Sequence, residues 1–109
     1  MVYNDPALAA RLTTALRRGL GNANVVPGEP RTGSEDFGVF GRVAGVPSVQ
    51  LSIGAVEPGK FASAKAAGTT VPGLHSPLFA PDREPTIRTA VAAFTLSVLE
   101  LVGTPAAEK

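Results

Sequence analysis

The heptapeptide from Pro47 to Ile53, PSVQLSI, is the clearest β-strand pattern in this chain of 109 residues. Val49, Leu51 and Ile53 alternate with small or amide-bearing polar residues, as in a strand with one apolar face. The segment Asn24 to Pro27 is a weaker candidate. Because one strand cannot form a sheet, its neighbours must come from another copy or from protein outside this sequence. We expect an α/β fold with about three helices and one or more strands.

Three segments have the spacing and the flanking residues of helices: 5–20, 34–44 and 84–102. Asp5 precedes a proline at the first position of the first helix, and Ser34 precedes two acidic residues at the start of the second. Ser and Asp side chains accept bonds from the free amides at a helix start, and acidic groups favour its positive end. A glycine follows each segment, which predicts where each helix ends.

The last of these helices is apolar around most of its circumference, so we expect it to be buried. Its predicted inner face consists of residues spaced alternately by four and three: Ile87, Val91, Phe94, Val98 and Leu101. Val91, Phe94 and Val98 are predicted to pack against the strand.

Glycine and proline together account for 22 of the 109 residues and gather in the middle of the chain. They gather from Pro27 to Gly33 and from Pro58 to Gly73. We expect residues 55–80 to form a long loop, with one helical turn near Phe61 to Ala67. Long loops in compact domains are frequently functional, so this is where we look for chemistry.

The charge distribution excludes several classes of protein. Ten Lys and Arg against nine Asp and Glu give a net charge of +1 without a basic run, which argues against nucleic-acid binding. The longest apolar stretch, near 90–102, is shorter than the ~20 residues of a membrane span, so no membrane partner is expected. The absence of cysteine and of a secretory signal pattern favours a cytoplasmic protein.

His75 is the only histidine and lies in the loop sequence GLHSPLFAPD. A lone histidine is more often a simple loop residue than a metal ligand. Similarly, Glu35 and Asp36 are adjacent and read first as favourable charges at a helix start. The glycine-rich loops match no phosphate-binding spacing, and no serine has a partner histidine in a recognised order.

In chain order, however, three longer segments resemble one family: NDPALAARLTTALRRGLG, GSEDFGVFGRVAGVPSVQLSIGA and GLHSPLFAPDREPTI. The family is that of the metal-dependent amidohydrolases and peptidases, which includes aminoacylases, hippurate hydrolase, carboxypeptidase G and the auxin-conjugate hydrolases. The resemblance extends from about Tyr3 to Val102 and covers the part of the catalytic domain that follows the lid domain. It implies that residues 1–109 form a single partial domain of the zinc-exopeptidase kind, without the lid domain or the N-terminal catalytic part.

The resemblance also implies a function for individual residues. His75 matches the family's late metal-binding histidine, and Glu35, Asp36 and Gly54 match positions near the substrate. The complete enzyme would use zinc, manganese, cobalt or nickel to activate water, and would hydrolyse N-acyl amino acids or similar small amides and peptides. A hydrolytic zinc site needs at least three protein ligands and a general base, which this sequence lacks. We therefore assign no catalytic residue and expect this chain alone to be inactive, with His75 exposed and no metal bound.

A second interpretation is a non-catalytic binding or assembly module that reuses the same scaffold. In either case we expect association, as a homo-oligomer or with the missing N-terminal part. Strand edges and apolar helix faces that lack partners recruit other chains.

Overall fold

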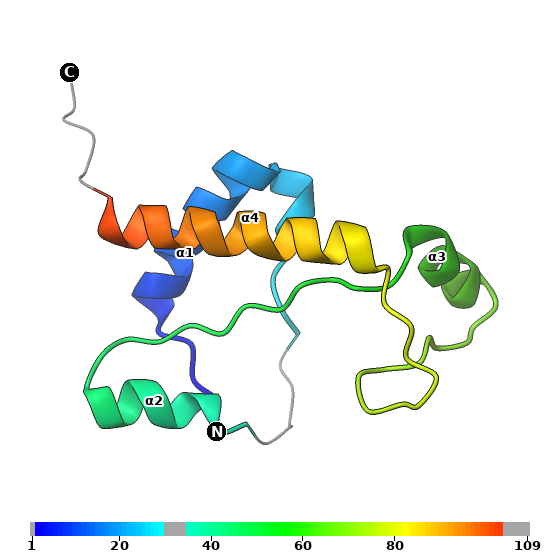
Figure 1. The fold of residues 1–109 in the computed structure, drawn as a ribbon, viewed down its shortest axis with the longest axis horizontal. Helices are drawn as coiled ribbons and strands as arrows, with labels where there is room; N and C mark the ends of the chain where they lie inside the picture. Colours follow the sequence, from blue (N-terminus) through cyan, green and yellow to red (C-terminus); the bar gives the residue numbers. More distant parts are fainter. Residues whose placement is uncertain (1, 30–34, 104–109) are drawn as a thin grey trace. The chain divides into compact units, whose positions relative to one another are not determined.

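The computed structural model describes residues 2–29 and 35–103, and these contain four α-helices, one 3-10 turn and no β-strand. The helices are α1 (Pro6–Leu20), α2 (Phe37–Ala44), α3 (Pro58–Ala66) and α4 (Arg83–Val102), with the turn η1 (Asn22–Asn24) after α1 (Figure 1). The predicted α/β class is wrong: the described part of the chain is all-helical. The prediction that the chain is one partial domain stays a prediction.

The chain divides into two compact units, which are described separately. Unit 1 comprises Met1–Ser52 with Ala92–Lys109, and unit 2 comprises Ile53–Val91. The helix α4 contributes its N-terminal part to unit 2 and its C-terminal part to unit 1.

The predicted strand segment Pro47–Ile53 carries no strand, because the described residues supply no second strand for a ladder. Figure 1 draws it as part of a long stretch without helical turns between α2 and α3. The part of this segment that belongs to unit 1 is hydrogen-bonded to the residues before α1: Asp5 N donates to the Ser48 carbonyl at 3.0 Å. The second strand candidate, Asn24 to Pro27, begins in η1 and continues without regular structure, so that prediction is also wrong.

The helix α1 forms as predicted, because its ends are determined by local groups. The Asp5 carboxylate accepts a bond from Leu8 N at 2.8 Å, and Pro6 occupies the first turn. Gly21, with φ of 90°, ends the helix and donates to the Arg17 carbonyl. Leu12 and Leu16, one helical turn apart on α1, are both buried.

The second predicted helix is confirmed over most of its length. α2 begins at Phe37 and ends before Gly45, which adopts the left-handed conformation that glycine tolerates best. The proposed Ser34 cap lies outside the described residues. The packing of α2 depends on Gly41, which is buried: a Cβ there would lie 2.6 Å from Ser48 Oγ and 3.0 Å from the Val46 carbonyl oxygen.

The helix α3 is longer than the single turn predicted within the loop at 55–80. Glu57 caps it: its carboxylate accepts bonds from Gly59 N at 2.7 Å and Lys60 N at 2.8 Å. Pro58 then fills the first helical position. The sequence Glu-Pro-Gly contains a proline and a glycine that suggest a loop, and the cap explains why a helix begins there.

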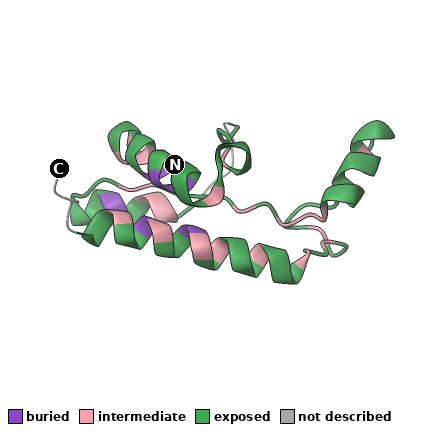
Figure 2. Ribbon diagram, turned by 90° about the horizontal axis from the view of Figure 1, so that it is seen from above, coloured by how far each residue is buried: buried purple, intermediate pink, exposed green. Residues whose placement is uncertain are grey.

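The helix α4 has the predicted ends, but the face that it buries is not the predicted one. Its buried residues are Ala93 and Ser97, whereas Phe94 of the predicted inner face is 72% exposed. Figure 2 shows how few positions of the helices are buried. The predicted packing of Val91, Phe94 and Val98 against a strand is therefore wrong. In unit 1 the small residue at one contact between the two helices lies on α1: a Cβ built on Gly19 would clash with the Leu96 side chain, so Leu96 packs directly against the Gly19 backbone.

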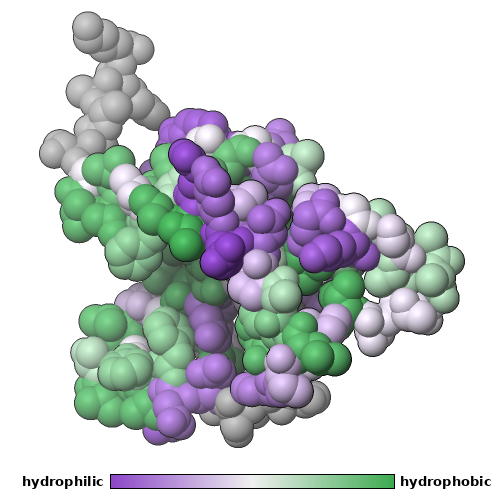
Figure 3. Space-filling model, turned by 45° about the vertical axis from the view of Figure 1, so that its right-hand side comes forward, coloured by the Kyte–Doolittle hydropathy of each residue, from purple (hydrophilic) through white to green (hydrophobic). Residues whose placement is uncertain are grey.

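The buried core of the described residues is correspondingly small. The buried hydrophobic residues all belong to α1 and the second half of α4: Leu12, Ala15, Leu16 and Ala93. Large apolar side chains remain on the surface instead, and Figure 3 shows them gathered in several places on the visible face.

One ionic cluster joins α1 to the end of α4 within unit 1. Arg11 Nε donates to Glu100 Oε1 at 2.9 Å, and Arg18 donates to the other carboxylate oxygen at 3.3 Å. Arg11 also donates to the Glu100 backbone carbonyl. The bond from Arg11 lowers the pKa of the Glu100 carboxyl below 4.5, and burial opposes this shift.

By length and composition alone, α4 is also long and apolar enough to cross a membrane. Core helices of soluble proteins meet the same criteria, so this is weak evidence. The expectation of no membrane partner stays a prediction.

Candidate functional site

The loop around His75 is held in a fixed shape by bonds centred on Ser76. Ser76 N donates to the Gly73 carbonyl at 2.9 Å, and Phe79 N donates to the Ser76 carbonyl at 3.0 Å. The Ser76 hydroxyl accepts a third bond, from Leu78 N at 3.1 Å. These bonds define two successive turns: His75 lies within the first, Gly73 to Ser76, and the half-buried Ser76 joins it to the second, which ends at Phe79.

His75 lies at the outer side of these turns and is exposed, as are its neighbours Leu74 and Leu78. No described residue forms a hydrogen bond with its imidazole or an ion pair with it. The loop is tied to the rest of unit 2 where it leads into α4: Asp82 N donates to the Ala55 carbonyl at 2.7 Å. The result is an ordered turn that displays an accessible imidazole.

The described residues do not complete a metal site around this histidine. Among residues 2–29 and 35–103, no three His, Cys, Asp or Glu side chains lie close enough together to hold a metal ion. An exposed imidazole fits the role of one ligand, but a structural or catalytic zinc site needs three or four. The chain as described therefore lacks the donor set for a metal centre.

Glu35 and Asp36 lie in unit 1, immediately before α2, and both are exposed. Asp36 is at the capping position, but its carboxylate makes no capping bond; only its carbonyl accepts a bond, from Val39 N at 2.9 Å. Their location agrees with the interpretation as charges at a helix start.

Gly54, the third predicted substrate residue, lies in unit 2 and is exposed. A Cβ built on it meets no atom within 4 Å, so its lack of a side chain leaves open space beside the backbone. Gly54 and His75 belong to unit 2 and the acidic pair belongs to unit 1, so the predicted residues are divided between the two units.

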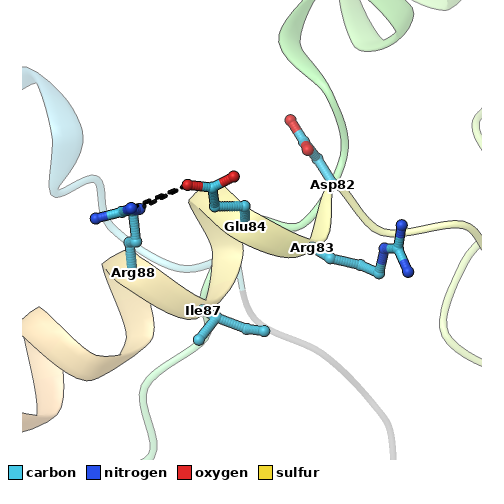
Figure 4. A pocket seen from close by; sticks show the side chains of 5 residues that line it. All are labelled: Asp82, Arg83, Glu84, Ile87 and Arg88. Atoms are coloured by element: carbon cyan, nitrogen blue, oxygen red, sulfur yellow. Dashed lines mark hydrogen bonds and ion pairs between the residues drawn. The ribbon is translucent and has the colours of Figure 1, made fainter.

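The sequence interpretation missed an open hollow at the start of α4, shown in Figure 4. It is lined by Asp82, Arg83, Glu84, Ile87 and Arg88. Glu84 accepts two bonds from the Arg88 guanidinium, each at 3.0 Å, and both side chains are about three-quarters exposed. The spacing of four residues between an acid and a base was the available signal. Such an exposed pair contributes little stability and leaves the hollow open to solvent.

A second hollow lies in unit 1 between α1 and α4, lined by Ala15, Arg18, Gly19, Leu96, Leu99 and Glu100. Its charged groups already pair with each other, since Arg18 donates to Glu100. The remaining residues that line it are Ala, Gly and Leu, which have no side-chain group for catalysis.

Comparison with protein-family models, with characterised proteins and with solved structures found no match to this chain.

Proposed function

We propose that this chain is the C-terminal part of the catalytic domain of a metal-dependent amidohydrolase, and that His75 is its contribution to the metal centre. The observation that carries the proposal is the His75 turn: an exposed imidazole without a hydrogen-bond partner, held by three bonds at Ser76. Supporting it are the sequence segments that resemble that family, including Ser-Glu-Asp-Phe and Leu-His-Ser-Pro.

The proposed reaction of the complete enzyme is hydrolysis of an N-acyl amino acid or a similar small amide. A divalent metal, which we propose to be zinc, manganese, cobalt or nickel, would supply the activated water. The part played by this chain is limited to presenting a neutral imidazole at a fixed position. In this proposal the remaining ligands and the general base come from polypeptide other than the described residues, which contain no ligand set.

The test is complementation with a polypeptide that carries the earlier ligands of such an amidohydrolase. The chain alone, with each of the four metals, is expected to turn over no N-acyl amino acid. The complemented sample is expected to bind metal and to hydrolyse one or more members of the panel. His75→Ala should abolish both properties, whereas Leu74→Ala, at the exposed neighbouring position, should leave both in place.

Two results would contradict the proposal. Turnover by the isolated chain that disappears in His75→Ala would make this chain an enzyme by itself. A complemented sample that assembles but takes up metal equally with and without His75 would show that the histidine is not a ligand. Metal content measured by mass spectrometry separates this second case from a failure of catalysis.

An assembly module without catalysis is a second candidate function, favoured by the exposed apolar side chains. In unit 1, Phe40 is 71% and Val43 is 79% exposed on α2, and Phe94 is exposed on α4. Monomeric proteins seldom leave large apolar patches uncovered. If this function is correct, complementation should give a stable complex without metal uptake, and Phe40→Ser should weaken that complex more than His75→Ala.

A further inference from the structure

The segment from Pro47 to Ser52 is held along one edge only. Asn4 Nδ2 donates to the Gln50 carbonyl at 3.1 Å, and Gln50 N donates to Asn4 Oδ1 at 2.8 Å. Asp5 N donates to the Ser48 carbonyl at 3.0 Å. Bonds at positions two apart on the same edge are the pattern of an extended strand, in which alternate residues direct their backbone groups to opposite edges.

The opposite edge is formed by the backbone groups of Val49 and Leu51. No described residue donates to or accepts from either of them. The Leu51 side chain is also exposed. An extended segment with one bonded edge and one open edge is a template on which another extended segment can pair.

The sequence lacks the features with which proteins protect such an edge. From Val43 to Val56 there is no charged residue, and Arg42 and Glu57 border this charge-free run. The only proline inside it is Pro47, at the start of the segment. Charged side chains, prolines and bulges normally prevent edge-to-edge pairing, and alternating uncharged segments favour it.

We propose that two copies of this chain associate by antiparallel pairing of the 47–52 edges, with Gln50 on the two-fold axis. The absence of charge makes the edge compatible with itself, and an isologous contact closes the assembly at a dimer. With Gln50 opposite its symmetry mate, Val49 of each copy lies opposite Leu51 of the other copy, which gives two such pairs. Each of these pairs exchanges two backbone bonds. This inference is independent of the amidohydrolase proposal.

Because the proposed dimer is symmetric, charged substitutions at Gln50 can test the register of the strand pairing. In this pairing the two Gln50 side chains lie directly opposite each other, at a Cβ separation of about 5 Å. Gln50 is bonded to Asn4 through its backbone only, and its side chain is exposed, so side-chain substitutions leave that contact intact. Gln50→Lys and Gln50→Glu each place like charges opposite one another, whereas a mixture of the two places opposite charges together.

The experiment is sedimentation of the full chain at about 100 µM and at low ionic strength, where surface charges are least screened. We expect the parent chain to dimerise and each single variant to dimerise about fivefold more weakly, as like charges opposite each other do in sheets. An equimolar mixture of the two variants should recover dimerisation. The matched controls are Ala62→Lys and Ala62→Glu on exposed α3, which change the net charge equally and should have no effect.

Three outcomes would overturn the proposal. The parent chain could remain monomeric at this concentration. Its dimer could be equally stable in both Gln50 variants. A dimer that dissociates on Phe94→Glu but not on Gln50→Lys would place the contact on α4 and not on the strand edge.

Discussion

The Asn4 side chain occupies the place of a neighbouring strand for Gln50, bonding both its N–H and its carbonyl oxygen. A single amide thereby satisfies two backbone groups 46 residues away in the sequence. Asn4→Ala should remove both bonds and lower the free energy of unfolding by about 1 to 3 kcal/mol, since a typical bond contributes about 0.5 to 1.5 kcal/mol. Asn4→Asp keeps the acceptor but loses the donor, so its cost should be intermediate. Urea denaturation of the three proteins measures the order.

Glu100 predicts a pH dependence of stability. Its pKa is lowered from 4.5 in the folded state, chiefly by the bond from Arg11. A lowered pKa stabilises the fold above the unfolded value of 4.5, and this stabilisation is lost as the pH falls through the lower folded value. Glu100→Gln should therefore lower Tm at pH 7, and the difference from the parent should shrink below pH 4.5. Glu84→Gln, at an exposed i,i+4 pair, should change Tm at pH 7 less.

Glu57 should control the first turn of α3. Two backbone N–H groups bond its carboxylate, which lowers its pKa from 4.5. Glu57→Ala should leave these amides without their cap, so hydrogen exchange at Gly59 and Lys60 should become faster. In the parent chain the same acceleration should appear on acidification below pH 4.5, after correction for intrinsic exchange rates. Lys65→Ala, near the other end of α3, should leave exchange at both amides unchanged.

Gly41→Ala should have two opposing effects on stability, one from helix propensity and one from packing. Alanine favours a helix interior over glycine by about 0.5 to 1 kcal/mol. The new Cβ would lie only 3.0 Å from the Val46 carbonyl oxygen, a backbone atom that has little freedom to move, and overpacking typically costs about 1 to 3 kcal/mol. The net effect should be destabilisation, measured by the denaturation midpoint. Gly54→Ala, where the Cβ has open space, should be neutral or slightly stabilising.

The helix ends were predictable because they depend on groups a few residues apart. Asp5 and Gly21 determine the limits of α1, and Gly45 determines the end of α2, without help from distant parts of the chain. The strand prediction failed for the complementary reason. Pro47–Ile53 has the right alternation, but a strand requires a partner, and among the described residues its only partners are Asn4 and Asp5.

The buried face of α4 could not be read from its periodicity. Apolar residues surround most of this helix, so the pattern does not distinguish an inward from an outward side. The residues that α4 buries are small, namely Ala93 and Ser97. The buried hydroxyl of Ser97 donates to the Ala93 carbonyl at 2.8 Å. The large side chain of Phe94 is left outside. At the candidate site, the position of His75 in a loop was predictable, whereas the bonds of Ser76 that shape the turn were not.

The outward placement of the large side chains on α4 has a calorimetric consequence. Because Phe94 and its exposed neighbours already contact water, unfolding hydrates little additional apolar surface, and the heat capacity of unfolding should be small for a chain of this length. Whatever covers these side chains on association would dehydrate them at that moment. We therefore expect association to have a large negative heat capacity change, because the apolar surface is buried in that step and not on folding.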